Sequence, residues 1–200
     1  MKKRRWPRIV GIVLLAGLAA FILWIEIWLK PVYPAFEQPH DSMAELQQAL
    51  SGQAGLLFPD LSGLDLAEAA YFAEVDGRTR FAHRTGNYRI EAITDSSPQF
   101  RYAVRAVAGA ELNLDAVEFY RGVGIAGLRQ NESAGGYSIS AHFLIGKWRY
   151  SLEGYVLKSD PNFLAADVES YYAEIGDTVW ELCCGIIDQA VTDTARSLRP

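Results

Sequence analysis

The stretch from residue 9 to residue 29 constrains this chain more than any other feature. It reads IVGIVLLAGLAAFILWIEIWL, and Glu26 is its one charged residue. As an α-helix it would be about 30 Å long, which is the thickness of the hydrocarbon core of a bilayer. The sequence therefore predicts a single transmembrane helix over 9–29, with Glu26 near the outer interface, where its carboxylate reaches water.

The charges that flank this helix set its orientation. Residues 1–8 contain five Lys and Arg, whereas Lys30 is the one basic residue directly behind the helix. The positive-inside rule then places the N-terminus in the cytoplasm and residues 31–200 on the other side of the cell membrane. A cleaved signal peptide shares these features, but the apolar run is longer than a signal-peptide core, and a cut after Ala19 would leave an apolar start on a soluble chain. We therefore favour a retained anchor.

Charge and composition divide the chain into four parts. Residues 1–30 carry six Lys and Arg and one acid, and residues 31–200 carry thirteen Lys and Arg and twenty-three acids, so the net charges are +5 and −10. An acidic exported part argues against nucleic acid as a partner. We predict a cytoplasmic basic tail (1–8), a transmembrane helix (9–29), a proline-rich stalk (30–40) and an extracytoplasmic domain (41–200), which is long enough for one hydrophobic core.

The pattern of apolar residues in the exported part predicts an α+β fold. Ser42 and Glu45 form a capping box, which predicts a short helix over about 42–51. From about residue 68 the apolar residues alternate with polar ones, as in an antiparallel sheet with one covered face. We expect about five to seven strands. The segments that carry this pattern are Ala70–Val75, Arg78–His83, Tyr88–Thr94, Gln99–Ala108, Val117–Tyr120, a bulged piece at 122–127, Tyr137–Ile145 and Trp148–Leu157.

A long amphipathic helix is predicted at the C-terminus. Asp160 and Pro161 suit an N-cap and a first helical residue. Gly176 and Asp177 are consistent with a break and a fresh cap, or with one continuous bent helix. From residue 178 the apolar positions keep a period of 3.6, so this helix should pack on the apolar face of the sheet.

No set of residues indicates a cofactor, a metal ion or catalysis. The segment 122–127 fits G-x-G-x-x-G, but the next residues leave no room for the helix that dinucleotide binding needs, so we interpret it as a bulged strand. His40, His83 and His142 lack the spacing of a metal site. Ser138, Ser140 and His142 share one strand face, which we interpret as solvent-facing. The adjacent Cys183 and Cys184 lie in the helical pattern and are interpreted as small apolar core residues.

Six arginines form the main candidate for a binding site. They fall within 28 residues that contain two acids, so this window is +4 inside a domain of −10. They are Arg78, Arg80, Arg84, Arg89, Arg101 and Arg105. Their alternation with apolar residues predicts that several point to the uncovered face of the sheet. Either cross-strand pairs with Glu68, Glu74, Glu91 or Glu153 neutralise them, or they bind an anionic partner: lipid headgroups, an acidic envelope polymer or an acidic protein surface.

These observations favour a membrane-anchored, extracytoplasmic binding or assembly module that is not an enzyme. Two alternatives stay open. One is a carrier that holds an apolar ligand between the sheet and the C-terminal helix. The other is a hydrolase that works on the open sheet face around His142.

Overall fold

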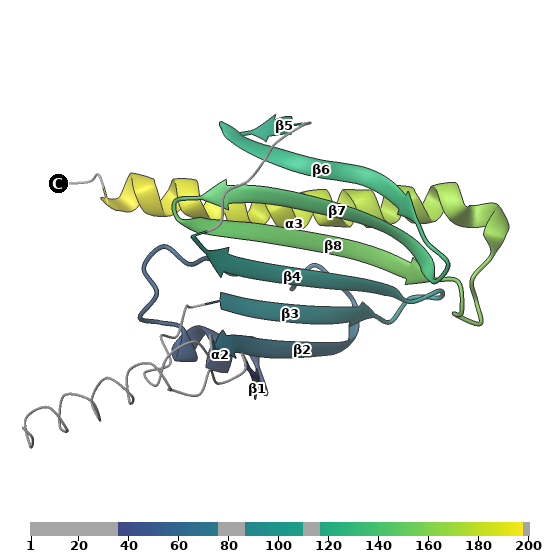
Figure 1. The fold of residues 1–200 in the computed structure, drawn as a ribbon, viewed down its shortest axis with the longest axis horizontal. Helices are drawn as coiled ribbons and strands as arrows, with labels where there is room; N and C mark the ends of the chain where they lie inside the picture. Colours follow the sequence, from purple (N-terminus) through teal and green to yellow (C-terminus); the bar gives the residue numbers. More distant parts are fainter. Residues whose placement is uncertain (1–35, 76–86, 110–116, 198–200) are drawn as a thin grey trace, which may run out of the picture. The chain divides into compact units, whose positions relative to one another are not determined.

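The computed structural model describes residues 36–75, 87–109 and 117–197, which form an α+β fold (Figure 1). Eight antiparallel strands make one open sheet in the order β1-β2-β3-β4-β8-β7-β6-β5. The strands are β1 (Phe36–His40), β2 (Leu66–Val75), β3 (Asn87–Thr94), β4 (Phe100–Ala108), β5 (Val117–Tyr120), β6 (Val123–Glu132), β7 (Gly136–Ile145) and β8 (Trp148–Leu157). The helices are α2 (Met43–Ala49), the 3₁₀-helix η1 (Ala165–Asp167) and α3 (Val168–Ser197). The predicted class is confirmed, with one strand more than the upper limit we expected.

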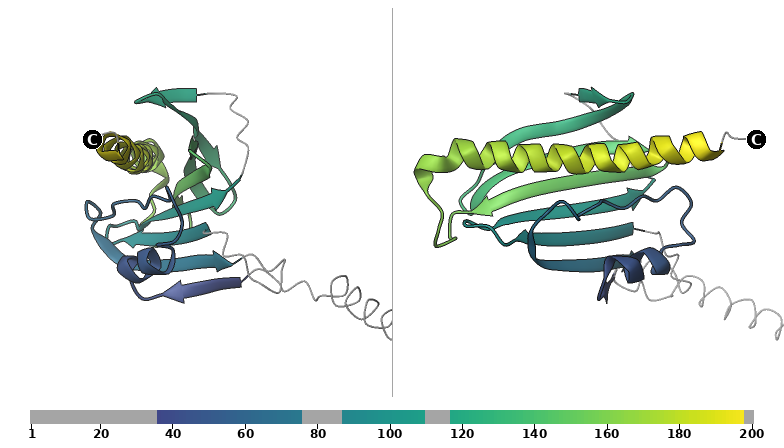
Figure 2. Two further views of the ribbon diagram at one scale, coloured as in Figure 1. Left: turned by 90° about the vertical axis from the view of Figure 1, so that its left-hand side faces the viewer. Right: turned by 180° about the vertical axis from the view of Figure 1, so that it is seen from behind.

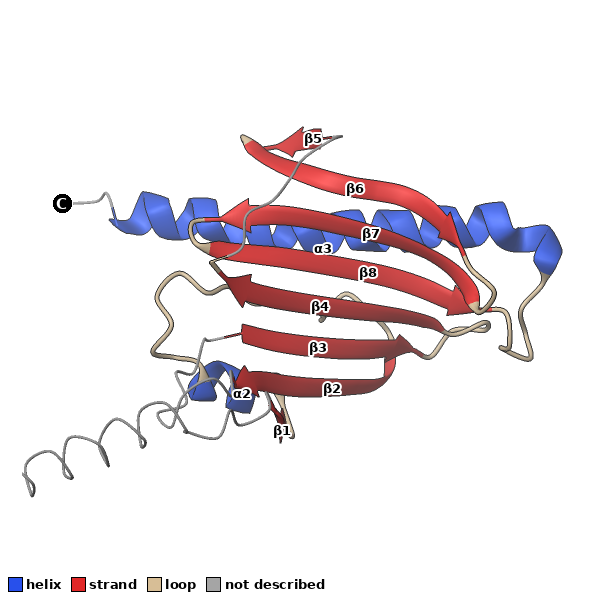
Figure 3. Ribbon diagram, viewed as in Figure 1, coloured by secondary structure: helices blue, strands red, loops and turns tan. Residues whose placement is uncertain are grey.

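All described helices lie on one side of this sheet, here termed the inner face (Figures 2 and 3). The long helix α3 packs on β6, β7 and β8, and α2 packs near β1 and β2. The loop between α2 and β2 supplies Leu56 and Leu61 to the same core. The opposite side, the outer face, is not covered by any element that the structure describes.

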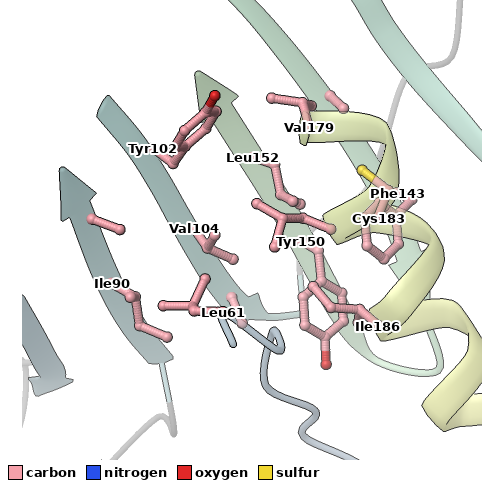
Figure 4. Packing of buried hydrophobic residues seen from close by; sticks show 14 of the residues in the cluster. Leu61, Ile90, Tyr102, Val104, Phe143, Tyr150, Leu152, Val179, Cys183 and Ile186 are labelled. Atoms are coloured by element: carbon pink, nitrogen blue, oxygen red, sulfur yellow. The ribbon is translucent and has the colours of Figure 1, made fainter. Parts of the chain in front are cut away.

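The core between α3 and the sheet is closely packed (Figure 4). Phe143, Tyr150 and Leu152 of the sheet are at most 1% exposed, as are Val179, Cys183 and Ile186 of α3. Gly154 has room for no larger side chain, because an added Cβ would lie 2.6 Å from Ile175 Cγ2. The predicted packing of the helix on the sheet and the core position of Cys183 are thus confirmed, whereas Cys184, also predicted as a core residue, is only partly buried. Burial also raises the pKa of the Cys183 thiol well above its usual range, since the thiolate would be desolvated.

The capping box at the start of α2 forms as predicted. The Ser42 hydroxyl accepts a hydrogen bond from the backbone N–H of Glu45. In return, the Glu45 carboxylate accepts one from the backbone N–H of Asp41 at 3.1 Å. The Ser42 bond satisfies an N–H group that the first helical turn leaves free, and the Glu45 bond fixes the residue before the N-cap, so the helix can begin at Met43.

Two predictions at the start of the domain need correction. Residues 36–40, assigned to the stalk, instead form the edge strand β1, in which Phe36 pairs with Val75. Proline is tolerated there because an edge strand has N–H positions that no neighbour uses. Both sides of β2 are paired, with β1 and β3. No side is left for the predicted hairpin with Arg78–His83, a segment that lies outside the described residues.

The strands from β4 to β8 follow the sequence pattern, although β6 runs to Glu132, beyond the predicted piece 122–127. The register shifts between Gly127 and Arg129, so the predicted bulge is present in β6. Gly127 has φ +96°, and an added Cβ would lie 2.4 Å from the Ser140 carbonyl oxygen. A glycine is required there by both conformation and space. The two-residue turn Gly146-Lys147 joins β7 and β8 as predicted.

The C-terminal helix begins later than predicted and has no break. One Asp160 carboxylate oxygen accepts a hydrogen bond from Asn162, as in a cap, but the other binds the backbone N–H of Gln99 and ties the segment to the sheet. The helix proper starts at Val168. Gly176 lies inside it, where an added Cβ would be 3.2 Å from Ile139 Cδ1. Here glycine allows close packing on β7 and does not end the helix.

No described helix has both the length and the apolar composition needed to cross a membrane. The predicted tail, the predicted transmembrane helix and residues 30–35 of the predicted stalk lie outside the described residues.

Candidate functional site

The outer face is the candidate site, because its side chains point away from α3 in a regular register. On β4, buried Tyr102 and Val104 alternate with Arg101 and Arg105. The pairing of β3, β4, β8 and β7 aligns the outward residues in rows across the sheet. The polar outward residues of these four strands are Arg89, Glu91, Arg101, Arg105, Ser138, Ser140, His142, Arg149, Ser151, Glu153 and Tyr155.

Arg89 is neutralised within the molecule. Its guanidinium forms ion pairs with Glu37 of β1, at 2.5 Å, and with Glu91 of its own strand. It also lies over the ring of Phe72, 4.7 Å from the ring centroid. Glu91 was one of the acids named as possible cross-strand partners, although it pairs here within the same strand. Glu37 was missed because residues 36–40 were assigned to the stalk. Such partly exposed pairs contribute about 0–1 kcal/mol each to stability.

Arg105 is also paired, with Glu74 of β2 at 2.9 Å. Glu74 is only 12% exposed, so the pair is partly desolvated and holds Arg105 toward the β1 edge of the sheet. Arg105 and Glu74 therefore follow the cross-strand alternative that the sequence analysis left open. Arg78, Arg80 and Arg84 lie outside the described residues, so the structure brings together three of the six predicted arginines.

Arg101 differs from its two neighbours. It forms no hydrogen bond or ion pair with any residue in the described part of the chain. Its direct neighbours across the strands are Ile93 on β3 and Tyr155 on β8, and all three are partly exposed. A cation between an aliphatic and an aromatic side chain is a common composition at the centre of protein interfaces.

Among the histidines in the described ranges, only His142 makes a polar contact on the outer face. Its Nδ1 lies 3.0 Å from the Ser151 hydroxyl oxygen, and Ser151 is its direct partner on β8. From the sequence alone, Ser138 and Ser140 were the serines expected beside His142. The two-residue turn at Gly146-Lys147 fixes the register of the hairpin, and this register pairs residue 142 with residue 151. The contact with Ser151 could therefore have been predicted from the sequence.

Burial and Arg149 both lower the pKa of His142 below its usual range, and Glu153 opposes them in part. The imidazole is therefore neutral at pH 7. Arg149 carries a buried Nε without a hydrogen-bond partner among the described residues. A neutral histidine beside a serine resembles half of a catalytic dyad.

The remaining candidates have structural roles. The glycines of 122–127 lie in the β5–β6 turn and in β6, and no helix follows them. Both cysteines are free thiols. No group of His, Cys, Asp or Glu within the described residues is arranged to hold a metal ion.

One hollow of about 430 Å³ opens beside α2, away from the outer face. The loop before β2 lines it with Phe58 and Asp60, and Tyr71 and Gln189 complete its wall. Asp60 accepts a hydrogen bond from the backbone N–H of Ser62, which lowers its pKa, so the lining is anionic at neutral pH.

The chain matches no protein-family model, no curated protein and no solved structure.

Proposed function

We propose that this chain is a membrane-anchored, extracytoplasmic binding or assembly module that is not an enzyme, and that an anionic partner docks on its outer face. One observation carries the proposal. The inner face is covered by α3, α2 and a loop, whereas the described elements leave the outer face uncovered across eight strands. A broad, rigid and solvent-facing sheet is a suitable surface for another macromolecule.

Arg101 is the most suitable centre for such a contact. Arg89 and Arg105 already form ion pairs with Glu37, Glu91 and Glu74. The positive charge of Arg101 is available, and Ile93 and Tyr155 beside it supply apolar surface. We therefore narrow the predicted arginine patch to Arg101 as the contact residue, with Arg105 at its margin.

The anchor keeps this surface close to the membrane. Because β1 begins at Phe36, only residues 30–35 separate the predicted transmembrane helix from the sheet. Six extended residues reach about 20 Å. This favours a partner that is itself in the membrane or in the adjacent envelope layer.

Capture from detergent-solubilised membranes tests the proposal. A C-terminally tagged chain should recover a partner at low salt and lose it as ionic strength rises. Arg101→Glu should reduce recovery at least tenfold. Lys158→Glu makes the same change of charge away from this face, and it should leave recovery unchanged. Repeated recovery of the bait alone, or equal effects of both variants, would contradict the proposal.

The orientation needs its own test. Protease added outside intact cells or spheroplasts should digest a C-terminal tag, whereas protease inside inverted vesicles should not reach it. A mature protein that begins after residue 19, or a tag protected from outside, would exclude the anchored module.

A hydrolase on the same face is the second candidate, because His142 contacts Ser151. A fluorophosphonate probe should label Ser151 if this serine is an activated nucleophile. Absence of labelling in the folded chain, with labelling of a known serine hydrolase in the same sample, would remove this candidate.

A further inference from the structure

The two ends of the sheet differ in which segments they bring together. Neighbouring strands are antiparallel, so each end of the sheet is formed by the first residues of some strands and the last residues of the others. One of these two ends contains Phe36, the first residue of β1. We term this the anchor end, because β1 enters the sheet there. It consists of Phe36, Val75, Asn87, Ala108, Tyr120, Val123, Ile145 and Trp148. The opposite set of ends is termed the far end. A ten-residue strand is about 33 Å long, so the two ends are well separated.

Charge is distributed unevenly between these ends. The far end carries Asp65, Asp95, Glu132, Asp160 and Asp167 against Lys158, a net charge of −4. The described residues at the anchor end carry Arg121 and Lys147 in two turns and Asp188 and Asp193 in the C-terminal turns of α3, so these charges cancel.

The anchor end also exposes apolar side chains. Phe119 of β5 is 72% exposed, the largest exposure of any large hydrophobic residue described. Val191, in the C-terminal turns of α3 that extend past this end, is 38% exposed (Figure 1). Arg121 pairs with Asp188 at 2.6 Å. Lys147 lies over the Trp148 ring, 4.9 Å from the ring centroid, and has no ion-pair partner in the described part.

Resting on the proposed membrane anchor, we propose that the anchor end of the sheet contacts the bilayer surface, with Phe119 among the headgroups and Lys147 against anionic phospholipid. The tether of about 20 Å holds Phe36 near the membrane. Exposed aromatic and basic side chains are the types that favour the headgroup region. The acidic far end is directed away from the anionic lipid, which would repel it.

Two exposed apolar residues at opposite ends provide a matched test. Phe119→Cys and Leu164→Cys, the latter residue 59% exposed and located in the segment that follows β8 at the far end, are each labelled with a fluorophore. The full chain carries Cys184→Ala, and Cys183 is buried. The proteins are placed in nanodiscs of phosphatidylcholine and phosphatidylglycerol that contain a lipid with a nitroxide headgroup. The nitroxide should quench the label at 119 at least twofold more than the label at 164.

Lys147→Glu tests the role of charge. It should reduce quenching at 119 in discs that contain phosphatidylglycerol and leave it unchanged in pure phosphatidylcholine. Equal melting temperatures of the labelled proteins show that the fold is kept. Equal quenching at 119 and 164, or stronger quenching at 164, would overturn the proposed contact with the bilayer. If Lys147→Glu left the quenching at 119 unchanged in discs with phosphatidylglycerol, the proposed attraction of Lys147 to anionic lipid would be wrong. A chain that inserts into discs without quenching at 119 refutes this inference alone, whereas a chain that does not insert refutes the anchor as well.

Discussion

The Tyr150 hydroxyl accepts a hydrogen bond from the backbone N–H of Leu57 at 2.9 Å, although 93 residues separate the two in sequence. Tyr88 completes the contact, because its hydroxyl donates to the carbonyl oxygen of the same Leu57 at 2.9 Å. Both tyrosine side chains are fully buried. Together they satisfy both backbone polar groups of one loop residue, so the loop before β2 can close over the part of the sheet that α3 does not cover.

Tyr150→Phe should lower the free energy of unfolding by about 1–2 kcal/mol, because the Leu57 N–H would then be buried without an acceptor. Thermal unfolding of the full chain in detergent measures this change. Tyr155→Phe is the matched control, since the Tyr155 hydroxyl on the outer face has no hydrogen-bond partner within the described ranges. Equal losses in both variants would contradict the role of the Leu57 contact.

The same two tyrosines should make the fold sensitive to alkali. Burial raises the pKa of Tyr150 to about 12, and it raises the pKa of Tyr88 well above its usual value. The unfolded chain therefore loses these protons first, so stability is complete below about pH 10 and falls as the pH rises toward 12. Each tyrosine contributes about 1.4 kcal/mol per pH unit in this window. Melting temperatures between pH 8 and pH 11.5 should fall less steeply in Tyr150→Phe, and an identical slope would refute the assignment.

Gly154 and Gly185 should respond to alanine with opposite signs. At Gly154 the new methyl group would lie 2.6 Å from Ile175 Cγ2 and 2.9 Å from Tyr102 Cε1. We expect a loss of about 1–3 kcal/mol from overpacking. At Gly185, within α3, nothing lies within 4 Å of the added carbon, and alanine should gain up to about 1 kcal/mol from helix propensity. Denaturant unfolding of both variants measures the difference, and a neutral Gly154→Ala would show that α3 does not pack as described.

His142 should titrate below its ordinary pKa, mainly because it is buried and also because Arg149 is near. Arg149→Gln should raise this pKa, and Glu153→Gln should lower it further. Because the unfolded chain binds the proton more readily, stability should fall as the pH drops below about 6.5. Imidazole proton shifts followed by NMR against pH report the pKa directly. No change in Arg149→Gln would indicate that the two side chains are not neighbours.

The elements that were predicted correctly are those determined by contacts between residues close together in the sequence. Ser42 and Glu45 form the capping box of a helix start, and a two-residue turn at Gly146-Lys147 fixes the β7–β8 register. These interactions join residues within a few positions of one another, so their geometry follows from the residues themselves. The alternation on β4 likewise placed Arg101 and Arg105 on one face before any partner was known.

Only the tertiary structure decided which segments meet. It built 36–40 into the sheet, which gave Arg89 the partner Glu37, and it left Arg101 without a partner in the described part. It also kept Gly176 inside a continuous helix, because close packing on Ile139 outweighs a local preference for a break. Contacts between residues far apart in sequence depend on the order of strands in the sheet, and no local pattern of residues records that order.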